Sequence, residues 1–341
     1  MKQYRIAVVG ATGIVGQEFI KILEQRDFPL SDIQLYASDG SAGKKLYVKH
    51  QESVVKEINH ESFTGTDMAF FSAGTNTSRH FVASANRAKT LVIDNSDAWR
   101  LEGDFPLVVP EVNIEDINAH KGVIINPTSP VIQMVVVLFP LHRINPIKRI
   151  IVTSYQSVAG AGQAAIEELT TQVRQVLDGQ PAVPRVFPHQ IAFNLLPEVD
   201  VFMDTGYTKE ERKFLEETRR IMHAPEIEVS ATCVRVPVYI ANSLALHVEF
   251  THPFPPEEAR QILMHAPGVK VLDDPTVNLY PQPWAVAGTD ECYVGRLRKD
   301  TAFKNGLAMW TVADNIRKGA ALNAVQILEE IIKRDLIATG G

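Results

Sequence analysis

The sequence contains little cysteine. Cys233 and Cys292 are its only cysteines, and two thiols cannot form the disulfide framework of a small secreted fold. Neither belongs to a Cys-X-X-Cys pair or to a Cys/His pattern with metal-ligand spacing. Both lie in apolar, strand-like runs, so we predict two buried thiols and no metal site.

Long hydrophobic runs and an excess of basic residues are also missing. The apolar runs are too short to cross a bilayer, and no targeting segment precedes the first folded pattern. Lys and Arg number 34 against 40 Asp and Glu, a net charge of -6, and no basic stripe is interleaved with aromatic residues. These absences predict a cytoplasmic protein that binds neither nucleic acid nor membranes.

The first part of the chain alternates buried strands with helices. This alternation predicts a doubly wound α/β domain with a parallel sheet, whose ligand loops follow the carboxyl ends of the strands. The length of 341 residues favours a second domain. Strands are expected at 4–9, 33–38, 68–74, 90–95 and 122–125.

The turn after the first strand is rich in glycine. It reads Gly10-Ala-Thr-Gly-Ile-Val-Gly16 and opens a helix that continues through Leu23. Glycines permit a tight turn, and the amides at a helix N-terminus suit a pyrophosphate. We therefore predict a dinucleotide site, with a turn that binds nothing as the alternative. The candidate residues are Gly10, Thr12, Gly13, Ile14 and Val15.

The second strand ends at Ser38 and is followed by Asp39. An acidic residue there accepts hydrogen bonds from the adenosine ribose hydroxyls and repels a 2′-phosphate, which favours NAD. Ser41 and Lys44 follow and could hold that phosphate. NADP therefore remains the alternative.

The stretch 122–136 runs from a buried-strand pattern directly into a helical one. Ser129 fits the N-cap and Pro130 the first helical position, where proline's missing N–H would be orphaned anyway. Such an elbow directs the capping side chain and free amides to one spot, as in enzymes that place a nucleophile beside an oxyanion site. A capped helix without chemistry is the alternative.

The remaining segments predict an α+β domain on an antiparallel or mixed sheet. We expect the chain to divide into 1–126 plus 311–337, and 127–310. Arg100 follows the fourth strand and could hold a phosphate or carboxylate, or form a surface ion pair. The expected elements of the second domain are strands at 149–156, 229–238, 244–250 and 269–272, helices at 163–176, 210–222, 256–265 and from Trp310 to about Ile337, and a loop at 181–188.

Together these stretches resemble the aspartate-β-semialdehyde dehydrogenase family over nearly the whole chain. The resemblance implies a Rossmann domain, a catalytic and dimerising domain, and a homodimer or higher oligomer. It also implies reduction of L-aspartyl-4-phosphate by NADPH through a cysteine thioester. The segments that carry it are Gly10–Gly16, Ser41–Lys44, Val108–Asn113, Phe187–Asn194, Ser230–Pro237 and Val312–Asn315.

Two residues depart from that family at the reacting centre. Its elbow reads Asn-Pro-Asn-Cys, and the matching segment Asn126-Pro-Thr-Ser129 puts Ser129 at the nucleophilic cysteine. Its histidine base lies seven residues after the substrate arginine, which places Asn242 there when counted from Arg235. A hydroxyl is hardly ionised at neutral pH, and asparagine accepts no proton. A third departure is Gly40, where the family usually has an arginine that grips the NADP 2′-phosphate.

Most substrate-binding positions of the family are matched. In this resemblance Arg235 grips the substrate carboxylate, Glu217 holds its amino group and Gln156 orients it. Glu217 also lies three residues before Arg220, so a solvated charge pair on one helix is the alternative. We predict a pocket for a small anionic amino-acid derivative. Of the other positions, Arg100 matches a phosphate-binding arginine, Arg220 stands in place of its partner lysine, Asn126 is matched for substrate, and Gly160 and Asn315 are matched for the cofactor.

These observations leave more than one function open. The first is an altered or non-catalytic paralogue that binds a dinucleotide and an anionic amino-acid derivative, and regulates or pairs with an active relative. The second is a working NAD(P)-dependent oxidoreductase that transfers hydride directly to a carbonyl or imine without a covalent thiol. A deliberate replacement of both residues is a third explanation, although Pro130 and Gly40 favour natural divergence.

Overall fold

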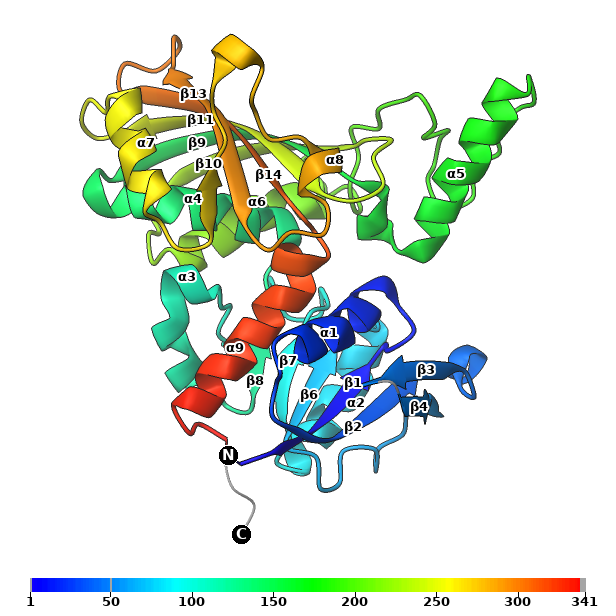
Figure 1. The fold of residues 1–341 in the computed structure, drawn as a ribbon. Coiled ribbons are helices and arrows are strands. Elements are labelled where there is room, and N and C mark those ends of the chain that lie inside the picture. Colours follow the sequence, from blue (N-terminus) through cyan, green and yellow to red (C-terminus); the bar gives the residue numbers. More distant parts are fainter. Residues whose placement is uncertain (1, 50, 338–341) are drawn as a thin grey trace. The chain divides into compact units, whose positions relative to one another are not determined.

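The computed structural model describes residues 2–49 and 51–337, except for the side chain of Asp39. The chain forms two compact units, coloured along the sequence in Figure 1. The first comprises 1–128 and the C-terminal segment from Ala320, and the second comprises 129–319. The sequence predicted that the first unit ends at 126 and resumes at 311, whereas in the structure it ends at 128 and resumes at Ala320.

The first unit is built on a six-stranded sheet in the order β5-β2-β1-β6-β7-β8. All neighbouring strands are parallel. The order reverses at β1, which pairs with both β2 and β6, and ligand loops of doubly wound sheets gather at such a switch point. The predicted Rossmann arrangement is confirmed. Its strands are β1 (Tyr4–Val9), β2 (Leu30–Ala37), β5 (Lys56–Glu57), β6 (Met68–Phe71), β7 (Leu91–Asp94) and β8 (Val123–Ile125).

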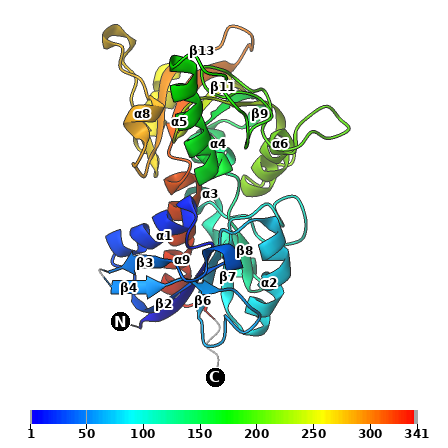
Figure 2. The ribbon, with the colours of Figure 1, turned by 90° about the vertical axis from the view of Figure 1, so that its right-hand side faces the viewer.

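Helices lie on both faces of this sheet (Figure 2). The β1–β2 and β6–β7 connections run in opposite directions along the sheet, so right-handed crossovers place their helices, α1 and α2, on opposite faces. Phe19 of α1 stacks on Phe70 of β6 with ring centroids 4.1 Å apart, and both rings are fully buried. The helices are α1 (Ile14–Gln25), α2 (Thr75–Arg87), α3 (Pro110–Asn113) and α9 (Leu322–Lys333), and a hairpin pairs β3 (Lys45–Val48) with β4 (Gln51–Val54).

The second unit contains a mixed six-stranded sheet in the order β10-β9-β11-β14-β13-β12. Its two outer pairs are parallel, and its three inner pairings are antiparallel. The predicted α+β class is confirmed. The strands are β9 (Ile147–Gln156), β10 (Glu228–Arg235), β11 (Asn242–Phe250), β12 (Val269–Val271), β13 (Cys292–Lys299) and β14 (Gly306–Ala313).

One face of the mixed sheet is covered by helices of the same unit. α4 (Ser129–Ile144), α6 (Lys209–Ile221) and α7 (Pro256–Met264) pack against its strands. On β11 the buried residues alternate with partly exposed ones, so the other face is open: Ala245 and His247 lie between buried leucines and a valine. Two further helices of this unit are α5 (Gln163–Leu177) and α8 (Pro283–Val286).

The prediction of a helix from Trp310 is wrong. Trp310 lies in β14, an antiparallel partner of both β11 and β13. Asp314 then ends the strand and starts a helical turn, because its Oδ1 accepts the backbone N–H groups of Ile316 and Arg317 at 2.7 and 2.9 Å. A π-helix at Arg317–Ala321 leads into α9.

Both cysteines are fully buried, as predicted. Each is in a strand, Cys233 in β10 and Cys292 at the start of β13. In the part of the chain that the structure describes, no helix combines the length and apolar character needed to span a membrane.

We expect the free energy of unfolding to fall between pH 7 and pH 5 because of His142 at the end of α4. Burial lowers the pKa of His142, and its Nδ1 accepts the N–H of Ile147 at 3.1 Å. A depressed pKa stabilises the fold above the pKa of the unfolded chain, and this stability is lost as the pH falls. The effect should be a fraction of the ~1.4 kcal/mol per pH unit that one proton permits, because the ring is half-buried.

Urea unfolding across this pH range measures the slope of the free energy of unfolding against pH. His142→Asn keeps an acceptor for Ile147 without a titrating ring, so its slope should be smaller than that of the unmodified chain. His265→Asn, at an exposed position, is the matched control and should keep the original slope. Equal slopes in all three proteins would contradict the role of His142.

Candidate functional site

The glycine-rich turn of the first unit requires its glycines. Gly10 has a φ of +90°, and a Cβ there would lie 2.3 Å from the carbonyl oxygen of Ser72. A Cβ on Gly16 would lie 2.2 Å from the carbonyl oxygen of Gly10. Gly13 precedes α1 without any side-chain cap, so the first amides of the helix are available to an anion. The other candidates around it, Thr12, Ile14 and Val15, are partly exposed.

The loop after β2 begins with a tight turn over residues 38–41. Ser41 donates its backbone N–H to the carbonyl of Ser38 at 2.9 Å, and Ser38 and Gly40 are exposed. The side chain of Asp39 lies outside what the structure describes. The preference for NAD over NADP therefore stays a prediction from the sequence.

Arg100 is not a surface residue. It is 8% exposed, and its guanidinium donates to the carbonyls of Asn126 and Asn95 at 3.1 and 2.9 Å and pairs with Asp97 at 2.8 Å. These contacts join the loops that follow β7 and β8. Its role toward a phosphate stays a prediction.

Asn126 is fully buried at the end of β8. Its side-chain amide donates to Asn95 Oδ1 and to the carbonyl of Ala320 at 2.7 and 3.1 Å, and its Oδ1 accepts from Asn323 at 2.7 Å. Both amide hydrogens are thus used within the first unit. The contact with substrate that the resemblance implies stays untested.

The structure brings Ser129 and Asn242 together in the second unit. Ser129 is the first residue of α4, so it lies in the helix and is not the residue before it, as the predicted N-cap would be. Asn242 begins β11, is 3% exposed, and donates from Nδ2 to Ser129 Oγ at 3.0 Å. Gly319 packs directly on Ser129, since a Cβ at 319 would lie 2.6 Å from the Cβ of Ser129.

Ser157 and Asn315 lie behind this pair. The backbone N–H of Ser157 donates to Asn242 Oδ1 at 3.0 Å. Asn315 Oδ1 accepts from Ser157 Oγ at 3.0 Å and from the backbone N–H of Ala241 at 2.9 Å. Both Ser157 and Asn315 are buried. Sequence reasoning missed Ser157, because a serine between a strand and a loop carries no distinctive pattern.

Arg235 connects to the same network at the end of β10. Its Nη1 donates to the carbonyl of Ser157 at 2.7 Å, and the residue is 7% exposed. Burial lowers its pKa, which the nearby Glu210 opposes, and arginine still stays charged at neutral pH. A Cβ on Gly160 would lie 2.8 Å from that Nη1. The structure thus places Gly160 against the guanidinium, where the absence of a side chain makes room for it.

Two further charged residues of α6 belong to this region, and the sequence analysis did not select them. Glu210 accepts a hydrogen bond from Gln156 at 3.3 Å and pairs with Lys213 at 3.0 Å. Lys213 also pairs with Asp200 at 3.1 Å and is 2% exposed. A capping box at the start of α6 sets the position of this first turn: Thr208 and Glu211 exchange side-chain hydrogen bonds with each other's backbone N–H.

Glu217 and Arg220 have the same spacing as Glu210 and Lys213 on the same helix. Glu217 is fully buried and lies about two turns further along α6. A spacing of three recurs along a helix, so it could not show which pair meets Gln156. The hydrogen bond from Gln156 to Glu210 identifies the pair, and its lysine is buried whereas Arg220 is partly exposed.

Cys233 is not placed to act as a nucleophile. Its side chain is fully buried, and burial, followed by the negative charge of Glu210, raises the pKa of the thiol far above its usual range. The thiolate is the reactive form of cysteine. Cys233 is therefore inert in the folded chain.

Known protein families match both units. Residues 5–120 match the semialdehyde dehydrogenase NAD binding domain, and residues 138–318 match the semialdehyde dehydrogenase dimerisation domain. An aspartate-semialdehyde dehydrogenase from Aquifex aeolicus is 53% identical over 339 residues, covering 98% of this chain and 99% of the relative. One from Bacillus subtilis is 43% identical and covers 97% and 98%.

Solved structures agree over the same length. The structure of aspartate semialdehyde dehydrogenase II from Vibrio cholerae, complexed with ASA, matches with a TM-score of 0.95 and 41% identity, covering 98% of this chain and 99% of that one. Aspartate semialdehyde dehydrogenase with NADP from Candida albicans matches with a TM-score of 0.78 and 25% identity, covering 98% and 100%. The chain therefore belongs to the aspartate-semialdehyde dehydrogenase family.

Proposed function

We propose that this chain is a family member that binds a nicotinamide dinucleotide and a small anionic amino-acid derivative but has lost thioester chemistry. The observation that carries the proposal is the hydrogen bond from Asn242 Nδ2 to Ser129 Oγ, 3.0 Å long. In the resemblance these two residues occupy the positions of the cysteine nucleophile and the histidine base. Here the partner of the hydroxyl is an amide donor, which removes no proton from it.

The chemical reason lies in the acidity of the two possible nucleophiles. A free thiol with a pKa of about 8.5 is partly ionised at neutral pH, whereas a serine hydroxyl needs a base to become nucleophilic. Asn242 is not a base, and Cys233 is buried and protonated. We therefore expect phosphorylating turnover to be near background, and a role in regulating or pairing with an active relative.

The binding residues support retention of a ligand. Arg235 is a buried cation, and Gln156 bonds to Glu210, which bonds to Lys213. We propose that Glu210 and Lys213, in place of Glu217 and Arg220, hold the amino group and the phosphate. Lys213 supports this choice because the family's phosphate partner is itself a lysine. Arg100 and Asn126 remain candidates of the first unit.

A kinetic assay tests the loss of chemistry. Oxidation of aspartate semialdehyde with phosphate and either NAD or NADP should be lower than in active relatives by roughly three or more orders of magnitude, the usual cost of losing a nucleophile and its base. Ser129→Cys together with Asn242→His should restore turnover, and either change alone should restore far less.

Activity of the unmodified chain in the range of active relatives would refute the proposal. NADPH-dependent formation of an alcohol from the semialdehyde, without phosphate, would instead support direct hydride transfer without a thiol. Binding of the semialdehyde with no product of either kind would favour the non-catalytic role.

We propose NAD as the preferred cofactor, because Asp39 and Gly40 stand where a 2′-phosphate would need a cation. The dissociation constant should be at least about tenfold lower for NAD than for NADP, a difference of about 1.4 kcal/mol. Asp39→Ala should narrow this ratio by removing the carboxylate. Titration of both cofactors by fluorescence measures it, and a clear preference of the unmodified chain for NADP would contradict the role of Asp39.

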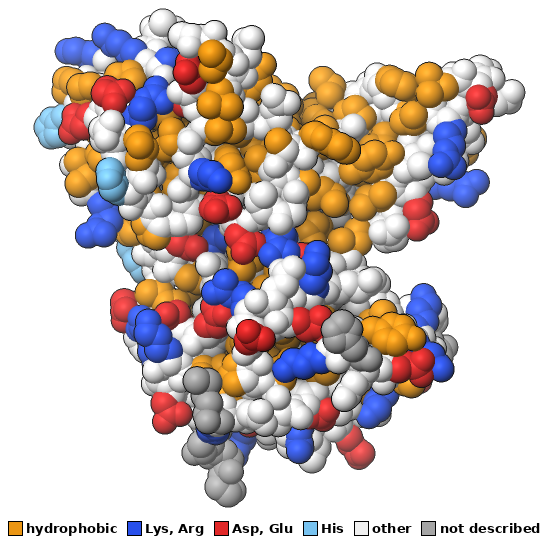
Figure 3. All heavy atoms as spheres, viewed as in Figure 1, with side chains coloured by type: hydrophobic (Ala, Val, Ile, Leu, Met, Phe, Trp, Pro, Cys, Tyr) orange, Lys and Arg blue, Asp and Glu red, His pale blue; other side chains and the backbone are white. Residues whose placement is uncertain are grey.

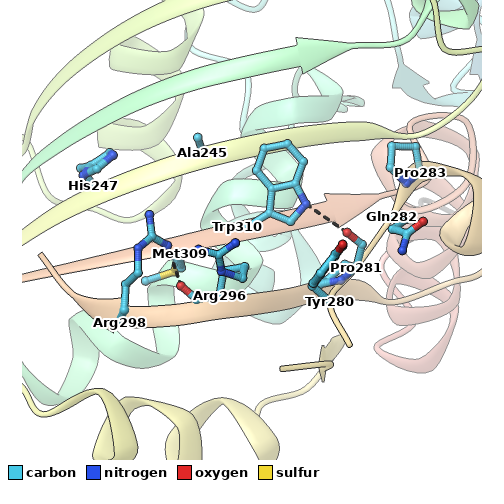
Figure 4. A pocket seen from close by; sticks show the side chains of 10 residues that line it. All are labelled: Ala245, His247, Tyr280, Pro281, Gln282, Pro283, Arg296, Arg298, Met309 and Trp310. Atoms are coloured by element: carbon cyan, nitrogen blue, oxygen red, sulfur yellow. Dashed lines mark hydrogen bonds between the residues drawn. The ribbon is translucent and has the colours of Figure 1, made fainter. Parts of the chain in front are cut away.

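We further propose a homodimer formed through the open face of the mixed sheet. The matching family model describes this unit as a dimerisation domain, and Ile151 on this face is 43% exposed. Figure 4 shows a pocket on the face where Arg296 and Arg298 of β13 approach Trp310 of β14, with a volume of about 420 Å³. A second copy of the chain bound to this face would cover both Ile151 and the pocket.

The segment between α5 and α6 adds apolar surface to the proposed interface. Hydrophobic side chains are gathered over this part of the second unit (Figure 3), and Val183, Phe193, Val201 and Phe202 are each more than half exposed. Exposed apolar surface of this extent is typical of protein interfaces.

Light scattering after size-exclusion chromatography tests the dimer. The unmodified chain should have about twice the monomer mass of 37.8 kDa. Ile151→Glu should shift it toward the monomer, because a charge buried in an interface has no partner. Val54→Glu, on the exposed β3–β4 hairpin of the first unit, is the matched control and should remain dimeric. A monomeric unmodified chain would refute the dimer.

A further inference from the structure

The orientation of the Asn242 amide is determined by its surroundings. Its Oδ1 lies 3.0 Å from the backbone nitrogen of Ser157, which can only donate. A flipped amide would set two N–H groups against each other. Nδ2 therefore faces Ser129 as a donor, and this assignment does not depend on the chemistry of Ser129 itself.

The residue that sets this orientation is itself held in place. Asn315 Oδ1 accepts the backbone N–H of Ala241 at 2.9 Å, so it is also the acceptor of the Ser157 hydroxyl at 3.0 Å. Ser157 is fully buried and Asn315 is 5% exposed. In this low-dielectric environment an unpaired polar group is costly, so the network favours one arrangement.

Backbone strain lies next to Asn242. Ala241 has a φ of +75°, a conformation that is strained for a residue with a Cβ and that is typically found at functional sites. Its N–H is the group bound by Asn315. The strained turn brings Asn242 to the start of β11, where its side chain reaches Ser129.

The orientation of Asn242 determines how the Ser129 hydroxyl can hydrogen-bond. Its oxygen already accepts a hydrogen bond from Asn242, so its own proton is directed to another acceptor. Ser129 is half-buried at the first turn of α4, where helical amides add positive potential. Arg235, a buried cation, holds the carbonyl of Ser157 behind the pair. The groups next to the Ser129 oxygen are therefore a hydrogen-bond donor, Asn242, and the positive end of α4.

We infer that the Ser129–Asn242 pair is a donor site for a carboxylate, with Ser157 and Asn315 as the positioning residues that orient it. The inference rests on the proposed function, in which the side-chain end of an aspartate-like ligand lies at Ser129. Hydrogen bonds to an ionised acceptor are about twice as strong as those to a neutral one. The site therefore selects the unreactive carboxylate of a free dicarboxylic amino acid over an aldehyde or an amide.

Isothermal titration calorimetry with L-aspartate and L-asparagine tests the selectivity. The two probes share the α-amino and α-carboxyl groups, so their difference isolates the side-chain end. At pH 7 the dissociation constant should be at least about tenfold lower for L-aspartate. Equal affinities, tighter binding of L-asparagine, or no binding of either probe would overturn the inference.

Asn242→Asp is the decisive variant, because it is isosteric and replaces the donor with a charged acceptor. It should remove the preference for L-aspartate over L-asparagine. Asn278→Asp, at an exposed position of the same unit, adds the same charge elsewhere and should retain the preference. Thermal unfolding checks that both variants fold. A preference that survives in Asn242→Asp would overturn the inference.

A thiol at position 129 gives a second readout that a purely structural role would not change. An N–H donor stabilises a thiolate and lowers the pKa of the thiol. The pH profile of alkylation of Ser129→Cys should therefore be shifted to lower pH than that of the variant that also carries Asn242→Asp. Cys233 and Cys292 are buried, and the unmodified chain supplies their background. Coincident profiles would contradict donation from Asn242.

These measurements separate the inference from the proposed function. Turnover by the unmodified chain would refute the loss of chemistry but leave the binding preference to be measured. Conversely, an inactive chain that shows no preference for L-aspartate would keep the proposed function and overturn the carboxylate site.

Discussion

The donation from the Ser157 backbone to Asn242 is the constraint on which the site depends. A backbone N–H has one polarity and cannot adapt, so it forces the amide of Asn242 to present its donor to Ser129. The other members of the network, Asn315 and the strained Ala241, hold that arrangement. The environment of the Ser129 hydroxyl therefore depends on the hydrogen bond between Ser157 and Asn242 as well as on Ser129 itself.

Buried charge is the second organising feature of the second unit. Arg235, Glu210 and Lys213 are each less than a tenth exposed, and isolated charges at such burial would be strongly unfavourable. They persist because Lys213 joins Glu210 and Asp200 in ion pairs, and Glu210 lies close to Arg235. Removing one member of this cluster leaves a buried charge without its partner, so the cluster contributes to the stability of the unit.

Both successes and failures of sequence reasoning have local physical causes. The strands of the first unit were predictable because a parallel sheet buries both of its faces and so leaves continuous apolar runs. Trp310 was assigned to a helix because strands buried among others show no alternation, and the Asp314 cap that starts the helical turn acts only after β14 has paired. Glu210 and Lys213 were passed over because helical spacing repeats along α6.

The sequence by itself determined the fold class, the glycine turn, the inert cysteines and the family, since these follow from apolar periodicity, glycine placement and long matching segments. It also determined that a serine and an asparagine stand at positions 129 and 242. Only the tertiary structure decided that these two residues touch, which of them donates, and which acidic residue of α6 meets Gln156. Hydrogen-bond polarity depends on neighbours far apart in the chain, and no local pattern contains it.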